Sequence, residues 1–364
     1  MSRLSGSNSR TFNIFRLNNR PIVHQRRCFY HAQSSNIALK PPYIRNTRNY
    51  SVKLIDDSID PGSYEILQPE LNGIVGVAHI LRRDVPGHIV RPPYARAASQ
   101  ADKLGGNHEF PYKGDGRIIL GGEEEKSLRR ACTLAKNTLK KASQLIRVGI
   151  TTDEVDSVLH EFIIKNGAYP SPLGYQGFPK SCCTSVNNIV VHGIPDDREL
   201  MDGDIVNFDI TVYLDGFHGD TSQTFQVGNV DKIGTELIEC TKEALEAGIR
   251  VCGPGVPFRE IGAAISSFVH KQSFPISISQ QFTGHGIGSV FHRPPWILHH
   301  KNEEPGVMLP GHCFTIEPAL IVGKEHEAFI FLDGWTASTL NGNRSAQAEH
   351  TVLITENGVD VLTR

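Results

Sequence analysis

The sequence predicts an α+β domain in which a unit of two helices followed by strands occurs twice. Amphipathic patterns predict one helix at 123–147 and a second that ends near Gly167, then two more at 232–252 and 257–271. Each pair is followed by an aromatic–proline step, Tyr169-Pro170 or Phe274-Pro275, and by strand-like sequence. Two such halves, each with a sheet face to bury, should pack into one domain with pseudo-two-fold symmetry.

Composition limits the functional class. The chain has 364 residues, of which 39% are hydrophobic, enough for one large domain with extensions. A net charge of −2 gives no general attraction to nucleic acid or to a membrane, and no apolar run reaches the roughly 18 residues of a membrane-spanning helix. Seven cysteines with no C-x-x-C pair indicate a reducing compartment rather than a disulfide framework. We therefore expect a soluble protein without nucleic-acid or membrane partners.

Residues 1–50 have the composition of a cleavable organelle transit peptide. No Asp or Glu occurs between Met1 and Lys53, whereas eight arginines recur among Ser, Asn and apolar residues. The recurrent arginines favour the mitochondrial matrix, with the plastid as the alternative. Arg48-Asn49-Tyr50-Ser51 predicts cleavage after Tyr50. A basic arm that binds RNA or the ribosome is the competing interpretation.

Residues 51–116 are interrupted by proline and glycine and cannot sustain a helix, as in the stretch at 85–94. We expect an extended strap over the surface of the domain, with a disordered linker as the alternative. Residues 117–364 then form the main domain. Within it, Thr151-Thr-Asp-Glu154 predicts a capping box at the start of the second helix.

A predicted hairpin carries two acidic residues on one face. Strand-like sequence runs from 203 to 225 around an Asp215-Gly216 turn, which supplies the positive φ that a two-residue loop needs. This loop places Thr211 opposite Asp220, so Asp209 and Asp220 become diagonal neighbours roughly 7 Å apart. Carboxylates this close repel one another unless a cation lies between them. The alternative is a solvated hairpin face.

Three further side chains could complete a metal site. His285 lies in Gly284-His-Gly-Ile-Gly288, whereas Glu317 and Glu349 lie in apolar or β-prone stretches where an unpaired charge is costly to bury. Each of these features alone has an ordinary structural explanation. Together, four carboxylates and one imidazole form an oxygen-rich, thiol-free set that suits a pair of Mn, Fe, Co or Zn ions better than a structural zinc.

The order of these five residues resembles that of type 1 methionine aminopeptidases. Val190-Val-His-Gly-Ile-Pro195 precedes the set and Asp333-Gly-Trp-Thr-Ala-Ser338 lies within it, and the resemblance extends from about Gly121 to the C-terminus. It implies the pita-bread fold and a metallo-exopeptidase that removes the initiator methionine during protein maturation. No Cys/His cluster occurs in residues 51–116, so the zinc-binding extension of cytosolic relatives is absent, as in an organellar form.

The resemblance also implies roles for the metal-binding residues. Asp209 would bind one of two divalent ions, Asp220 and Glu349 would bridge both, and His285 and Glu317 would complete the other. A hydroxide activated by the two metals would attack the first peptide bond, with Glu317 as the proton shuttle. His192 and His292 would contact the scissile amide and stabilise the intermediate.

The resemblance further implies a methionine pocket and a class of substrate. The pocket would be lined by Tyr175, Phe178, Cys183, Phe291 and Trp335, since a thiol and aromatic edges favour a thioether. The substrates would be nascent polypeptides with a free N-terminal methionine and a small second residue, which implies a link to peptide deformylase. Relatives suggest a monomer. Pro172, Ala348 and Arg293-Pro294-Pro295 depart from the bacterial pattern and affect only the expected shape and charge of the pocket.

Three alternatives remain. A proline-specific enzyme of the same fold usually carries a large N-terminal domain, and only about 115 residues precede the catalytic region here. A type 2 aminopeptidase would have a helical insertion between Glu317 and Glu349, which are too close for one. A metal-free binding module for proteins or RNA would have lost ligands, and this chain keeps all five.

Overall fold

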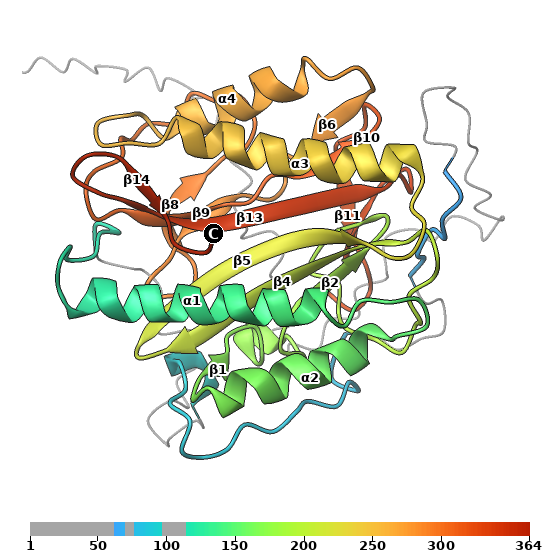
Figure 1. The fold of residues 1–364 in the computed structure, drawn as a ribbon, viewed down its shortest axis with the longest axis horizontal. Helices are drawn as coiled ribbons and strands as arrows, with labels where there is room; N and C mark the ends of the chain where they lie inside the picture. The colour runs from blue at the N-terminus through green and yellow to red at the C-terminus, as the bar shows by residue number, and fades with distance from the viewer. Residues whose placement is uncertain (1–61, 70–75, 97–113) are drawn as a thin grey trace, which may run out of the picture.

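The computed structural model describes residues 62–69, 76–96 and 114–364 (Figure 1). The predicted transit peptide and its cleavage site at Tyr50 lie outside the described residues. None of the helices within these ranges combines the length and the apolar character that a membrane span requires.

The four main helices form the two predicted pairs. They are α1 (Glu123–Ser143), α2 (Thr152–Lys165), α3 (Lys232–Arg250) and α4 (Arg259–Val269). The capping box before α2 is confirmed, because the Glu154 amide donates to the Thr151 hydroxyl over 3.1 Å and the Thr151 amide donates to the Glu154 carboxylate over 2.8 Å. α4 begins two residues later than predicted, since Pro257 instead forms a β-bridge with Val307. α1 ends four residues earlier than predicted, because the Leu145 amide donates a hydrogen bond to the Ala142 carbonyl in a tight turn.

An eleven-stranded sheet forms the centre of the domain, with a main path in the order β1-β4-β5-β13-β9-β7-β8. These strands are β1 (Tyr169–Pro170), β4 (Ile205–Leu214), β5 (Phe217–Gln226), β13 (Ser345–Ile354), β9 (Cys313–Ile316), β7 (Gly284–Gly286) and β8 (Arg293–Ile297). Off this path, β2 (Cys183–Val186) pairs with β4, β10 (Ala319–Val322) and β14 (Val359–Val361) pair with β13, and β6 (Ile276–Ile278) pairs with β10. A second sheet joins β11 (Ala328–Ile330), β12 (Ala337–Thr339) and β3 (Ile189–Val191).

The helices cover one face of the main sheet, and the two halves repeat each other. α1 packs on β4 and β5, whereas α3 packs on β13 and β10 (Figure 1). On β4, Val206, Phe208 and Ile210 belong to the core beneath the helices of the first half. Because side chains alternate along a strand, Asp209 and Thr211 point to the opposite face. This repeat of helix pair and strands confirms the predicted α+β class.

The described parts of the N-terminal segment contact the domain. Leu67 exchanges backbone hydrogen bonds with the Asn188 side chain at 2.7 and 2.9 Å. Val85 and Ile89 are buried in a small apolar cluster with Tyr169, Leu173 and Tyr213. The short 3₁₀ turns η2 (Pro93–Ala95) and η4 (Tyr175–Gly177) also contact each other.

Candidate active site

The hairpin that carries the two aspartates has the predicted register. Thr211 lies opposite Asp220, Leu214 lies opposite Phe217, and Asp215 and Gly216 both adopt positive φ in the turn. The Thr211 hydroxyl donates a hydrogen bond of 2.6 Å to Asp220 Oδ1. Asp220 is buried and Asp209 is half-buried, so the hairpin presents the pair to a pocket rather than to bulk water.

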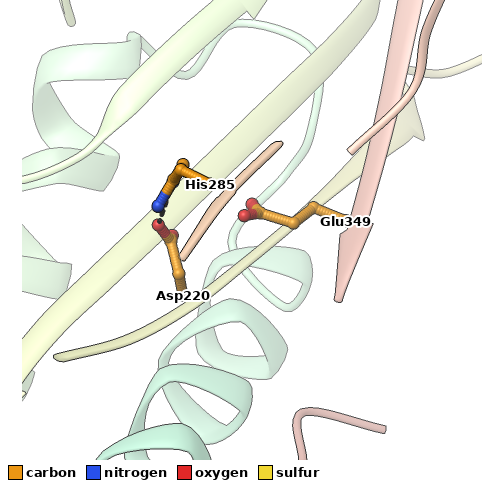
Figure 2. Close-up of side chains that lie close together, drawn as sticks. All are labelled: Asp220, His285 and Glu349. Carbon is orange, nitrogen blue, oxygen red and sulfur yellow. Dashed lines mark ion pairs between the residues drawn. The ribbon is translucent and has the colours of Figure 1, made fainter. Parts of the chain in front are cut away.

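Side chains from three separate strands meet beside Asp220. One ligand atom each from Asp220 on β5, His285 on β7 and Glu349 on β13 lies within 4.8 Å of the other two, and all three residues are buried. Figure 2 shows these three side chains pointing toward one another. Nε2 of His285 is 3.7 Å from Asp220 Oδ2 and 3.6 Å from Glu317 Oε1. Asp209 lines the same pocket, so the structure brings all five predicted ligand residues together.

Burial changes the pKa of every member of this set. It raises the pKa of Asp209 to about 7 and that of Glu317 to about 8. Burial and the neighbouring carboxylates hold the pKa values of Asp220 and Glu349 well above the usual range, and burial lowers the pKa of His285 to about 4. Four crowded carboxylates with a neutral imidazole are costly without a positive charge between them. This donor set, with mixed oxygen and nitrogen atoms and no thiolate, fits divalent transition ions.

Uncharged groups orient the Glu317 side chain. The Thr315 hydroxyl donates to Glu317 Oε1 over 2.7 Å and accepts from the His285 backbone amide over 3.0 Å, so it connects the Glu317 side chain to the backbone of β7. The Gln347 amide donates to Glu317 Oε2 over 3.3 Å. Such partners fix the direction of a ligand oxygen before a cation binds.

The glycines around His285 are explained by close packing of strands. A Cβ on Gly284 would lie 2.3 Å from the Thr315 carbonyl oxygen, and one on Gly286 would lie 2.3 Å from the Pro294 carbonyl oxygen. Only glycine lets β7 fit between β8 and β9, which holds the imidazole against the carboxylates.

The pocket continues from the acidic cluster into an aromatic region. Tyr175, Phe178, Cys183, Phe291 and Trp335 line it, as predicted from the resemblance, together with His192 and His292. The Trp335 ring meets those of Phe178 at 5.2 Å and His192 at 5.9 Å. The Tyr175 ring lies 5.0 Å from that of His292. A polar end rich in carboxylates therefore adjoins an apolar end with one thiol.

Comparisons with known proteins agree with this geometry. The model of metallopeptidase family M24 matches residues 126–356, more than half of the chain. Methionine aminopeptidase 1D, chloroplastic/mitochondrial, of Arabidopsis thaliana is 47% identical over 78% of this chain and 77% of its own length. The mitochondrial methionine aminopeptidase 1D of Homo sapiens is 41% identical over 94% of this chain and 92% of its own length. The solved methionine aminopeptidase of Rickettsia prowazekii has a TM-score of 0.66 at 40% identity, covering 68% of this chain and all of its own.

The chain belongs to the methionine aminopeptidases of metallopeptidase family M24. It is a hydrolase, and its pita-bread fold is the one expected from the resemblance. The relatives from Arabidopsis thaliana and Homo sapiens carry organellar names. Membership of this metallopeptidase family implies divalent metal ions, in agreement with the cluster at Asp220.

Four pocket residues of this aminopeptidase were not predicted as site residues, namely Pro172, Gln176, Thr211 and Phe282. The sequence did contain a signal for Thr211, because the predicted hairpin pairing already placed this residue opposite Asp220. The sequence contained no signal for Phe282, because the contact of its ring with that of His192 at 5.7 Å depends on how two distant loops pack. Arg293, one of the departures from the bacterial pattern, donates to the Ile287 carbonyl over 2.9 Å and is buried, so its charge does not line the pocket.

Proposed function

We propose that this chain removes the initiator methionine from nascent proteins whose second residue is small, using two divalent metal ions. The observation that carries the proposal is the pocket itself, in which four carboxylates and His285 adjoin a region of aromatic rings and one thiol. The acidic end would hold the ions and receive the free amine, while the apolar end would receive the thioether. The named relatives support this assignment.

Asp209, Asp220, His285, Glu317 and Glu349 would hold the ions, whose identity among Co, Mn, Fe and Zn depends on availability. When bound, divalent ions would supply an acidified water and positive charge toward the substrate carbonyl. Asp209 would bind the first ion. Asp220 and Glu349 would bind both ions, and His285 and Glu317 would complete the binding of the second. The closeness of Asp220, His285 and Glu349 supports their sharing of one ion.

Three side chains would act on the peptide. Glu317 would take a proton during attack and deliver it to the leaving amine, a role supported by its place in the pocket and by the hydrogen bonds from Thr315 and Gln347 that orient its carboxylate. His192 and His292 would contact the scissile amide. Burial lowers the pKa of His192 to about 4 and that of His292 well below its usual value, so both are neutral at pH 7 and can donate a hydrogen bond without carrying charge.

The pocket also suggests which substrates are accepted. Tyr175, Phe178, Phe291 and Trp335 would enclose one unbranched side chain, with the Cys183 sulfur beside the methionine thioether. A formylated amine would not approach the acidic cluster, so deformylation would come first. This is the link we propose to peptide deformylase.

A pair of peptides tests the activity. Purified protein with Mn, Fe, Co or Zn added in turn should release methionine from a Met-Gly peptide and little from a Met-Leu peptide. Asp220→Asn should abolish the release and reduce bound metal. Cleavage of Xaa-Pro peptides but not of Met-Gly or Met-Ala peptides would instead assign the proline-specific activity. Release by a metal-free protein would contradict the metal site.

We further propose that the protein is a monomer that acts in the mitochondrial matrix after cleavage behind Tyr50. The organellar names of the relatives and the acid-free N-terminus support the location. N-terminal sequencing of the protein isolated from mitochondria should begin at Ser51. A mature N-terminus before Arg45, or recovery of the protein from plastids alone, would contradict the proposal.

A further inference from the structure

A strained turn forms one wall of the substrate pocket. Tyr175 and Gln176 in η4 both line the pocket, and Gln176 adopts φ 46° and ψ 29°, in the left-handed region that side chains other than glycine rarely occupy. Gly174 and Gly177 on either side also have positive φ. Such a conformation persists only where the surrounding structure enforces it.

The N-terminal segment supplies contacts to both ends of this turn. The Arg82 guanidinium donates to the Gly177 carbonyl over 2.9 Å. The Tyr94 ring meets the Tyr175 ring edge-on at 5.0 Å, and its hydroxyl donates to the Ser171 carbonyl over 2.6 Å. Tyr175 in turn packs on Phe291 at 4.9 Å, so Tyr94 supports a stack of rings that forms the pocket wall.

The same segment contacts the loop that leads to the pocket thiol. Asp156 is fully buried and accepts from Arg83 over 2.9 Å and from the amides of Ser181 and Cys182 over 2.8 and 3.2 Å. Arg83 therefore neutralises the carboxylate that holds the backbone just before Cys183. His160 makes a second connection between the N-terminal segment and this loop. Its Nε2 is hydrogen-bonded to the Asp84 carbonyl and its Nδ1 to the Ser181 hydroxyl, both at 2.8 Å.

These contacts come from outside the part of the chain that the family model covers. Residues 82–94 precede the match at 126–356. They are anchored to the domain by Val85 and Ile89, which are 7% and 4% exposed in the apolar cluster with Leu173 and Tyr213. Arg82, Arg83 and Tyr94 make their contacts with the turn η4, with Asp156 on α2 and with Ser171.

We propose that residues 82–94 are a positioning element of the methionine pocket, with Tyr94 as its main positioning residue. The segment holds η4 in its left-handed conformation and fixes the loop before Cys183, so it sets the shape of the pocket without contacting the reacting atoms. The specificity part of this inference rests on the proposed function. Loss of Tyr94 should weaken substrate binding and leave the metal site intact.

The test compares variants of the full chain. Tyr94→Ala should raise KM for a Met-Gly peptide about tenfold, the size expected from losing one packed aromatic contact, and should leave kcat within about twofold. Bound metal should equal that of the wild type. Tyr94→Phe keeps the ring and should retain most of the wild-type KM, whereas Tyr94→Leu keeps apolar bulk for folding but should behave like Tyr94→Ala.

Tyr64→Ala is the matched control, because Tyr64 is also an N-terminal tyrosine whose hydroxyl donates to a domain carbonyl, that of Gly342 at 3.2 Å, and it does not line the pocket. It should leave KM unchanged. Hydrogen exchange measured by mass spectrometry on the 171–178 peptide should accelerate in Tyr94→Ala and not in Tyr64→Ala.

Two results would overturn the inference. One is wild-type exchange at 171–178 together with wild-type KM in Tyr94→Ala, and the other is an equal effect of Tyr64→Ala on both quantities. Failure of the wild type to release methionine would reject the proposed function instead. The exchange measurement would still decide whether residues 82–94 order the turn.

Discussion

The backbone amide of Glu317 donates a hydrogen bond of 3.0 Å to Nε2 of His299, which is buried behind the glutamate. This bond requires His299 to carry its proton on Nδ1, and burial, which lowers the pKa of the imidazole to about 3, keeps the ring neutral. His299 thereby fixes the backbone from which the Glu317 carboxylate projects.

Substitution of His299 should impair catalysis through Glu317. In His299→Ala the Glu317 amide loses its buried acceptor, and losing the group that positions Glu317 should reduce kcat or metal affinity about 10–100-fold. Steady-state methionine release and metal titration would measure both. His299→Gln, which can still accept the bond, should recover part of the loss. Full activity in His299→Ala would show that the bond does not position Glu317.

Removal of one buried charge should have opposite effects on metal binding and on folding. Asp220→Asn should bind metal much more weakly, because a ligand shared by the cluster is lost. The metal-free variant should nevertheless be more stable than the metal-free wild type, since fewer buried carboxylates repel one another. Thermal unfolding after chelation would test this. A lower melting temperature for the metal-free variant would contradict the predicted repulsion.

Metal addition should stabilise the wild type strongly. A ligand that binds only the folded state at 100 times its Kd adds about 2.7 kcal/mol. Thermal unfolding with and without Mn, Co or Zn would measure the shift, and Asp220→Asn provides the control that should show little of it. An equal shift in the variant would place the ions elsewhere.

The metal-free protein should lose stability as the pH rises from about 6.5 to 8. In the unfolded chain Asp and Glu titrate near pH 4, but folding raises the pKa of Asp209 to about 7 and that of Glu317 to about 8. The folded state therefore holds protons that the unfolded state has released, so the free energy of unfolding falls with pH. The buried histidines, with lowered pKa values, have the opposite effect only below about pH 6.5.

Melting temperatures of chelated protein across this pH range would check the slope. Saturating metal should flatten it, because ionised carboxylates are then neutralised by the cations. A stability of the metal-free protein that is independent of pH, or that increases, would contradict the raised pKa values.

The predicted capping box can be tested by two matched threonine substitutions. Thr151→Ala removes the acceptor of the Glu154 amide at the start of α2 and should cost about 1 kcal/mol. Thr133→Ala lies on an exposed position inside α1, where alanine is the better helix former, so stability should be unchanged or slightly higher. Chemical denaturation would compare the two. Equal losses would argue against the cap.

Local sequence patterns predicted much of the fold, because the turn, the capping box and the amphipathic periodicity each favour the same conformation that tertiary packing requires. The Asp215-Gly216 turn determines the register of the hairpin, which in turn places Asp209 and Asp220 on one face. The capping box and the amphipathic patterns located the helices to within a few residues. The boundary error at Pro257 arose because a proline suited to a helix start forms an isolated β-bridge with the distant Val307 instead.

The remaining features depend on packing between distant segments. The partnership of His299 with Glu317 joins two loops that no local pattern relates, and the Phe282 ring reaches His192 only in the folded domain. The contacts of Tyr94 with Tyr175 and Ser171 are equally non-local. Frequent proline and glycine, as in residues 51–116, indicate an extended backbone, but they do not indicate which surface of the domain that backbone covers.

The position of β13 has a consequence for biosynthesis. This strand comes late in the sequence, yet it lies at the centre of the sheet between β5 and β9 and carries Glu349. A chain still emerging from the ribosome therefore lacks both its central strand and one side of its acidic cluster. The acidic cluster therefore cannot form until the C-terminal part of the chain has joined the sheet, in whichever compartment the chain folds.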